Sequence, residues 1–401
     1  MKRMKQLLAV LTAASLAAAA LAGCGSKADE TEAQGAQTEG TEAVNTAGGT
    51  FKIGGIGPTT GGAAVYGLGV KNAAELAVAE INAAGGISGY QIEFNFQDDE
   101  HDAEKAVNAY NSLKDWGMQM LMGTVTSTPC TAVVDKTKDD NMFQLTPSGS
   151  AVESIQYDNA FRVCFSDPNQ GTASAQYIGE NGLATKVAVI YDSSDVYSTG
   201  IFEKFAEEAG NQGFEIVAAE AFTADSKTDF SVQLQKAKDA EAELVFLPIY
   251  YTEASLILTQ ANTLGYAPKF FGCDGLDGIL AVENFDTKLA EGVMLLTPFA
   301  ADAEDELTKN FVSAYQEAYG EIPNQFAADS YDAIYIMKAA IEKENITPDM
   351  SISDICEAMK TAMTEITVDG LTGEGMTWTA DGEPSKAPKA VKIVEGAYQA
   401  M

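Results

Sequence analysis

From residue 50 onward, segments with the period of a strand alternate with segments with the period of a helix. Residues 50–57 predict a strand that runs into a loop of Gly, Pro and Thr, and residues 70–84 predict a helix that ends at two glycines. A strand at 90–96, a helix at 103–113 and a short buried strand at 118–122 follow. A β-α-β-α-β series of this kind folds as a parallel sheet covered by helices.

The same alternation starts again further along the chain. We expect helices at about 171–180, 199–210, 229–239 and 253–264, and strands at 186–191, 214–220, 243–248, 269–272 and 292–297. No short sequence repeat accompanies the second series, so the two series are alike in architecture only. A chain of 401 residues has room for two domains of ordinary size. We therefore predict two α/β lobes.

The N-terminus has the order of a secretory signal peptide. Lys2, Arg3 and Lys5 precede a short apolar run that ends in Leu-Ala-Gly and then Cys24. This ending resembles the lipobox of bacterial lipoproteins, which implies cleavage after residue 23 and lipidation of Cys24; an ordinary signal peptide with an incidental cysteine is the alternative. Residues 24–49 hold almost nothing large and apolar, which predicts a disordered tether. We expect an extracytoplasmic protein anchored to the cell membrane through its lipidated cysteine.

Composition excludes several classes of function. A formal net charge of −33 repels nucleic acid and anionic headgroups, so we expect neither as a partner. The single histidine, His101, cannot supply a hydrolase triad and a metal site, and neither G-x-S-x-G nor H-E-x-x-H occurs. We predict no enzyme, no cofactor and no metal site. Four further cysteines either pair outside the cell or remain free thiols: Cys130, Cys164, Cys273 and Cys356.

Four stretches in a fixed order carry a family resemblance. They are residues 53–61 (Ile-Gly-Gly-Ile-Gly-Pro-Thr-Thr-Gly) with residues 66–67 and 79–87, then residues 96–99, 122–128 and 144–150. Together with residues 191–192, 272–275 and 329–333, they resemble the leucine/isoleucine/valine-binding family of periplasmic-binding-protein-like receptors. The resemblance covers residues 50–395. Members of that family are the substrate-binding components of branched-chain amino-acid ABC importers.

The resemblance implies a type I periplasmic-binding-protein-like fold. This is an α/β fold of two doubly wound parallel-sheet lobes joined by three crossovers, which would fall near residues 166–170, 296–300 and 376–380. Lobe 1 would comprise residues 51–167 and 298–377, and lobe 2 residues 168–297 and 378–401, with the last strand at 389–394 returning to lobe 2. Helix starts and strand ends of such lobes face a cleft, where open α/β sheets bind ligands.

Hydroxyl side chains gather where two predicted strands end. Residues 126–128 (Thr-Ser-Thr) leave a buried strand and open the helix that we expect after Pro129. Residues 148–150 (Ser-Gly-Ser) take the same place after the next strand. Hydroxyls and backbone N–H groups at a helix start suit a carboxylate, although N-capping alone would also account for either cluster.

The resemblance assigns roles to individual residues. In the family, the positions that match Thr126, Ser127, Ser148 and Ser150 grip the α-carboxylate of the ligand, and the position of Asp274 holds its α-ammonium. The family more often carries a glutamate at that last position, so the shorter side chain of aspartate is a departure.

Aromatic residues complete the implied site. Tyr66, Tyr197 and Tyr250 match positions that wall the pocket, and Phe326 matches a position near the ligand side chain. His101, which we expect on a surface loop, and the threonine at position 126 lie where the family's prototype pairs two cysteines. The resemblance therefore implies that this disulfide is absent here.

These observations favour a binding function over catalysis. We predict a substrate-binding lipoprotein of an ABC importer that captures a small amino acid, branched-chain or similar aliphatic, between two closing lobes. Its partners would be that ligand, the permease subunits in the membrane and the lipid anchor, and we expect a monomer. The alternatives are a receptor for a small amide, urea or aromatic acid, a ligand-sensing module for a signalling partner, and a carboxylate-pair hydrolase.

Overall fold

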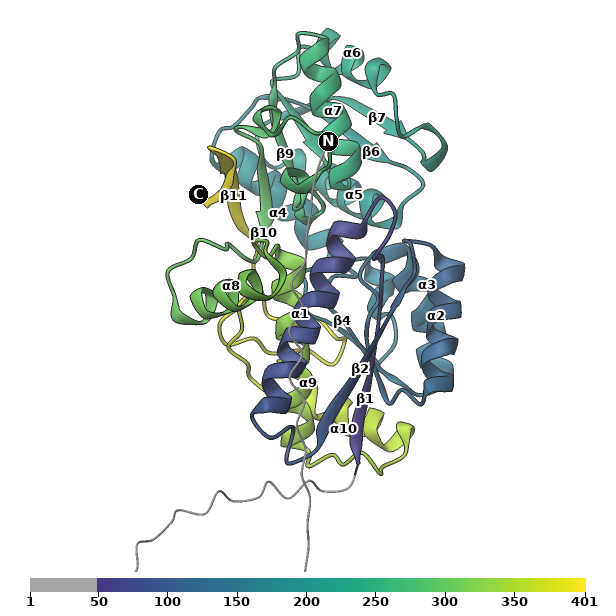
Figure 1. Ribbon diagram of the computed structural model, residues 1–401. Coiled ribbons are helices and arrows are strands. Elements are labelled where there is room, and N and C mark those ends of the chain that lie inside the picture. The colour runs from purple at the N-terminus through teal and green to yellow at the C-terminus, as the bar shows by residue number, and fades with distance from the viewer. Residues whose placement is uncertain (1–48) are drawn as a thin grey trace, which may run out of the picture. The chain divides into compact units, whose positions relative to one another are not determined.

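The computed structural model describes residues 49–401 (Figure 1). The predicted signal peptide, Cys24 and nearly all of the predicted tether lie outside the described residues. Within residues 49–401, no helix has the length and apolar character that crossing a membrane requires.

The first sheet has five parallel strands in the order β2-β1-β3-β4-β5. Its strands are β1 (Thr50–Gly57), β2 (Gln91–Asp98), β3 (Met120–Gly123), β4 (Phe143–Thr146) and β5 (Ala160–Arg162). The order reverses between β1 and β3, which is the doubly wound arrangement in which ligands bind beyond the carboxyl ends of the strands. The sheet predicted from the first β-α-β-α-β series is confirmed.

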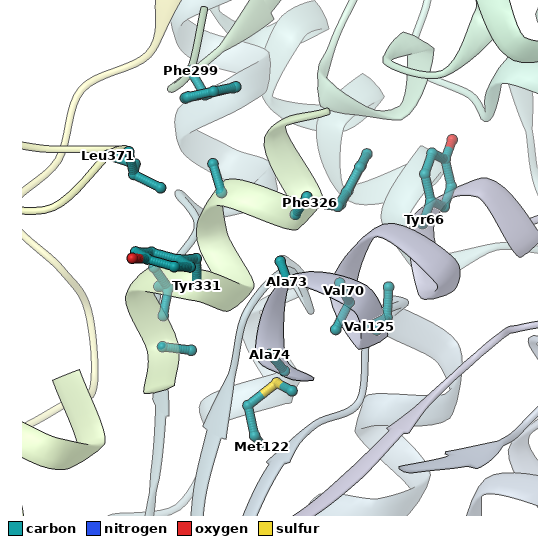
Figure 2. Packing of buried hydrophobic residues seen from close by; sticks show 14 of the residues in the cluster. Tyr66, Val70, Ala73, Ala74, Met122, Val125, Phe299, Phe326, Tyr331 and Leu371 are labelled. Atoms are coloured by element: carbon teal, nitrogen blue, oxygen red, sulfur yellow. The ribbon is translucent and has the colours of Figure 1, made fainter. Parts of the chain in front are cut away.

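Helices cover both faces of this sheet (Figure 1). The helices beside it are α1 (Ala64–Ala83), α2 (Ala103–Trp116), α3 (Ser127–Asp139), α8 (Glu306–Tyr319), α9 (Gln325–Lys343) and α10 (Ile352–Met363). Figure 2 shows Val70 and Ala73 of α1 in one buried cluster with Tyr331 of α9. We call this sheet with its helices lobe 1.

Helix α1 begins at Ala64, six residues before the predicted start at residue 70. The added residues of the helix include Gly67. A Cβ at this position would lie 1.9 Å from the carbonyl oxygen of Pro58. Glycine therefore allows the first turn of α1 to pack directly on the loop that follows β1, even though glycine is a poor helix former.

The second sheet has seven strands in the order β12-β11-β10-β9-β8-β6-β7. Its strands are β6 (Lys186–Asp192), β7 (Glu215–Phe222), β8 (Leu244–Leu247), β9 (Lys269–Gly272), β10 (Met294–Thr297), β11 (Lys389–Val394) and β12 (Ala397–Ala400). Strands β6 to β10 are parallel to one another, as predicted from the second series. The helices beside them are α4 (Asp167–Glu180), α5 (Val196–Ala209), α6 (Ser231–Asp239) and α7 (Tyr251–Thr263). We call this sheet with its helices lobe 2.

Strands β11 and β12 form an antiparallel hairpin at one edge of the second sheet. The two residues between them, Glu395 and Gly396, have φ values of 53° and 78°. Two consecutive positive φ values are those of a type I′ turn, which fits the twist of a two-residue hairpin. Sequence analysis predicted β11 but not the short edge strand β12.

Three connections join the two sheets, between β5 and α4, between β10 and α8, and between α10 and β11. The longest of them, residues 364–388, is tied to α9 by a buried ion pair. Lys386 Nζ lies 2.7 Å from Asp329 Oδ1 and 2.7 Å from Thr372 Oγ1, and the Lys386 side chain is only 1% exposed. The predicted bounds of the lobes within these connections stay a prediction.

Candidate ligand-binding site

One small cavity lies where strands of both sheets end. The empty space between its walls is about 220 Å³, a volume that includes space open to solvent, and its lining comes from both lobes. The lining residues are Tyr66, Val125, Thr126, Ser127, Ser148, Ser150, Tyr197, Tyr250, Asp274, Gly275 and Phe326. The structure thus brings together all nine residues that sequence analysis placed in a pocket, and adds Val125 and Gly275. That any of them contacts a ligand stays a prediction.

The start of helix α3 forms one wall of the cavity. Thr126 is the N-cap residue, yet its side chain makes no capping hydrogen bond. The helix begins at Ser127 and so includes Pro129, which we expected to precede it. Because proline has no N–H, the free donors of the first turn are the N–H groups of Ser127 and Thr128. These groups and the positive end of the helix dipole favour an anion.

The serines of the second cluster lie beside this helix start. The Ser127 and Ser150 hydroxyl oxygens are 3.4 Å apart, and Ala151 N donates a hydrogen bond of 3.1 Å to Ser127 Oγ. Ser148 Oγ donates to Val125 O at 2.6 Å, so this hydroxyl proton is already committed. The helix that follows these serines is a 3₁₀ helix of only four residues, Val152–Ile155.

Arg162 fixes the loop that carries the second cluster. Its side chain is fully buried, and its guanidinium donates hydrogen bonds to the carbonyl oxygens of Gly149, Ser150 and Ala151. Sequence analysis did not single out Arg162, because a lone arginine in a short strand carries no local signal of this role.

Asp274 lies on the opposite wall, after β9 of lobe 2. Its Oδ1 accepts a 2.7 Å hydrogen bond from the Tyr197 hydroxyl, and its backbone N–H donates to Gln170 Oε1 at 3.1 Å. From lobe 1, Gln325 Nε2 donates to the carbonyl oxygen of Asp274 at 2.9 Å. Burial raises the pKa of Asp274 to about 7, although the hydrogen bond from Tyr197 opposes the rise. A carboxylate of this kind is poorly solvated and suits a cationic partner.

Four aromatic residues line the space between the start of helix α3 and Asp274. The rings of Tyr66 and Phe326 are 4.3 Å apart between centroids (Figure 2), and those of Tyr197 and Tyr250 stack at 4.9 Å. Tyr250 lines the cavity, while its neighbour Tyr251 packs edge-on against Tyr66 at 4.9 Å. The aromatic wall is therefore apolar in its middle and polar at its hydroxyl ends.

Hydrogen bonds across the cleft hold the two lobes closed around the cavity. Thr128 Oγ1 donates to Asp195 Oδ1 at 3.0 Å, and Thr252 Oγ1 donates to Gly62 O at 2.7 Å. The Tyr66 hydroxyl of α1 donates to the carbonyl oxygen of Gly275 in lobe 2. The structure is accordingly the closed form of a two-lobed binding fold.

Further buried carboxyl groups surround the cavity, and sequence analysis missed them. Both carboxylate oxygens of Asp167 are buried without a hydrogen-bond partner among residues 49–401. Burial raises the pKa of Asp167 well above its usual value and raises that of Asp195 and of Asp277 to about 6. The lobe 2 side of the cavity is therefore rich in carboxyl groups that burial keeps from ionising freely.

His101 lies in a loop, as expected, but it is half-buried rather than at the surface. Its Nδ1 lies 2.9 Å from Thr126 Oγ1, and its ring meets Tyr250 edge-on at 5.3 Å between centroids. The two positions at which the family's prototype has a disulfide are thus joined here by a hydrogen bond. Burial lowers the pKa of His101.

The four cysteines of the described residues are buried free thiols: Cys130, Cys164, Cys273 and Cys356. Of the two alternatives that the sequence left open, free thiols are the one observed. Burial raises the pKa of each thiol, which makes all of them poor nucleophiles. Among residues 49–401, no group of three or more His, Cys, Asp or Glu side chains is placed to hold a metal ion.

Comparisons with known proteins agree on one family. A family model described as periplasmic binding protein matches residues 50–397. The chain is 31% identical over 301 residues to the Leu/Ile/Val-binding protein homolog 3 of Brucella melitensis, covering 74% of this chain and 80% of that protein. It is 29% identical over 296 residues to the leucine-, isoleucine-, valine-, threonine- and alanine-binding protein of Pseudomonas aeruginosa, covering 73% and 78%.

Among solved structures, the chain resembles the branched-chain amino acid transporter substrate binding protein LivJ from Streptococcus pneumoniae in complex with isoleucine. The TM-score is 0.79 at 29% sequence identity, and the match covers 88% of this chain and 98% of LivJ. These relatives are binding proteins of transporters rather than enzymes, which agrees with the sequence prediction.

Proposed function

We propose, from the premise that the chain belongs to the periplasmic binding protein family, that it is the extracytoplasmic substrate-binding lipoprotein of an ABC importer. Its ligand is a small amino acid, branched-chain or similar aliphatic, held in the cavity between the two lobes. The names of the relatives support this class of ligand. One is a leucine-, isoleucine-, valine-, threonine- and alanine-binding protein, and another is named a Leu/Ile/Val-binding protein homolog.

The observation that carries the proposal is that one small cavity has a site suited to an anion on one side and a site suited to a cation on the other. We call them the carboxylate pole (the start of α3 with Ser127) and the ammonium pole (Asp274). Lobe 1 presents the uncapped start of α3 with the Ser127 hydroxyl, which suits a carboxylate. Lobe 2 presents the buried carboxyl of Asp274, which suits an ammonium. A zwitterion fits both poles at once, with its side chain against Tyr66 and Phe326.

The aromatic lining of the cavity indicates which ligand side chains fit it. An aliphatic side chain suits the aromatic wall, because Tyr66 and Phe326 bring ring faces rather than further charges to it.

Two poles on different lobes also explain how binding drives closure. In the closed form both charges of a zwitterion are satisfied, whereas an open form satisfies only one of them. A ligand shifts a conformational equilibrium only by its difference in affinity between the two states. The closed form is then the signal that a membrane permease reads, and the lipid on Cys24 keeps the protein near that permease.

Calorimetry on the chain without its signal peptide tests the proposal. L-leucine, L-isoleucine, L-valine and L-alanine are titrated beside leucinamide, which lacks the carboxylate, and 4-methylpentanoate, which lacks the ammonium. We expect at least one amino acid to bind and each truncated analogue to lose tenfold or more. Binding of leucinamide alone would keep the family and refute the amino-acid assignment.

Two variants locate the ammonium pole. Asp274→Asn keeps the shape of the side chain and removes its charge, so we expect most amino-acid affinity to be lost and small-angle scattering to show no compaction on ligand addition. The exposed Asp225→Asn is the matched control and retains both. Wild-type affinity in Asp274→Asn would remove Asp274 from the site.

A further inference from the structure

We propose that His101 is a positioning residue for the ligand carboxylate. It holds the Thr126 hydroxyl away from its own helix, so that the Thr128 N–H at the start of α3 stays free for the ligand. The inference rests on the proposed function in one respect, that the cavity takes a carboxylate at this wall. The experiments described below test the role of His101 separately from the proposed function.

The start of α3 leaves one donor for which a side chain and a ligand compete. Thr126 is the N-cap, with extended backbone angles of φ −108° and ψ 152°, the conformation from which a threonine normally caps its helix. An N-cap oxygen accepts from the N–H of the second or third helical residue. The third residue here is Pro129, which has no N–H, so Thr128 N–H is the only donor that the Thr126 side chain could cap.

The capping bond is not made, and His101 is the reason. Its Nδ1 lies 2.9 Å from Thr126 Oγ1, which turns the hydroxyl toward the histidine loop rather than toward the first turn of α3. Thr126 and Ser127 both line the cavity. The helix start that borders the cavity therefore keeps the Thr128 N–H group uncapped, where a capping hydroxyl would occupy it.

The imidazole is fixed in place from several sides. The His101 backbone N–H donates to Asp99 Oδ1 at 2.9 Å, and Asp99 is fully buried. The next residue, Asp102, caps helix α2 by accepting from Lys105 N at 2.9 Å. The far side of the ring meets Tyr250 of lobe 2 edge-on at 5.3 Å between centroids. The position of the ring is thus set by lobe 1 and completed when lobe 2 closes.

The surroundings keep the ring neutral. Burial and the nearby Lys227 lower the pKa of His101, whereas Glu253, Asp192 and Asp102 oppose that shift, and the pKa is lowered on balance. A neutral imidazole either donates or accepts at Nδ1. In both cases the Thr126 hydroxyl is engaged by the ring and not by the helix.

Amide hydrogen exchange in the ligand-free protein tests the first half of the inference. His101 has φ of 59°, so His101→Gly removes the side chain without straining the backbone. We expect the Thr128 amide to exchange about fivefold more slowly in His101→Gly, because Thr126 then caps it. Exchange returns to the wild-type rate in His101→Gly/Thr126→Val, which has no hydroxyl to cap. An unchanged Thr128 rate in His101→Gly overturns the inference.

Calorimetry with L-isoleucine tests the second half. We expect His101→Gly to weaken binding about fivefold or more, Thr126→Val to abolish any further effect of the histidine substitution, and His101→Asn to restore much of the affinity. Asparagine tolerates positive φ and carries an amide that reaches a neighbouring hydroxyl. Glu100→Ala, on the exposed neighbour in the same turn, is the matched control and binds like wild type.

The two experiments distinguish failure of this inference from failure of the proposed function. Equal losses from His101→Gly in the Thr126 and the Thr126→Val backgrounds would mean that the histidine acts through general packing, and would overturn the inference. If wild type binds no carboxylate-bearing amino acid, the proposed function fails. The exchange rates of Thr128 still decide whether His101 governs the helix start.

Discussion

The buried carboxyl of Asp274 should make ligand affinity depend on pH. Burial raises the pKa of Asp274 to about 7, and an ammonium group binds only its ionised form. Below pH 7 the ligand must therefore displace a proton, and the affinity falls about tenfold for each further pH unit. At pH 5 about one molecule in a hundred carries the ionised group, so binding should be weaker by roughly 2.7 kcal/mol than above pH 8.

The sign of this effect distinguishes Asp274 from other causes. A carboxyl whose pKa is raised in the protein binds an ammonium group more tightly as the pH rises. This pH dependence of the affinity ends above that pKa, where the carboxyl is already ionised in the ligand-free protein. Isothermal calorimetry at pH 5, 6, 7 and 8, in two buffers of different ionisation enthalpy, measures both the affinity and the protons released. We expect close to one proton released at pH 5, about half at pH 7 and few at pH 8.

Asp274→Asn is the decisive comparison. It should bind weakly and lose most of the pH dependence, while the control Asp225→Asn keeps the wild-type slope. Asp195 and Asp277, whose pKa values burial raises to about 6, would leave a smaller slope below pH 6 in the variant. Equal affinity of the wild type at pH 5 and pH 8, with no proton release, would refute the reasoning.

Three further outcomes are expected. Ser127→Ala and Ser150→Ala should each weaken binding about tenfold or more, since a hydrogen bond to a charged group contributes roughly 1.5–3 kcal/mol; calorimetry showing unchanged affinity in both would contradict the carboxylate pole. Lys386→Met leaves a buried carboxylate unpaired and should lower the free energy of unfolding by about 3–5 kcal/mol in urea denaturation. Lys309→Met, in an exposed pair, should lower it by less than about 1 kcal/mol. Equal effects of the two substitutions would show that the buried pair has no special role. Cys24→Ala should release the protein into the medium or leave it unprocessed, as fractionation would show, and membrane retention with normal cleavage would refute lipidation.

The sheets could be predicted because periodicity is a local property. Each parallel strand lies between two helices of its own βα unit, so the sequence pattern carries the order of elements directly. The prediction failed where tertiary contact overrides local preference. Gly67 belongs to helix α1 because Pro58 leaves no room for a side chain, and the hairpin partner β12 is set by a turn of Glu395 and Gly396 rather than by an apolar pattern.

The residues of the site also fall into those that the sequence predicted and those that it did not. The lining residues lie just after strand ends or at helix starts and match positions of the family, so residue order and resemblance were enough to bring them together. Arg162, Gln325 and Asp167 could not be found, because each is polar, lies in an ordinary sequence context and acquires its role only when segments distant in the chain bury it. The contact of Gln325 with Asp274 crosses 51 positions of sequence and joins the two lobes.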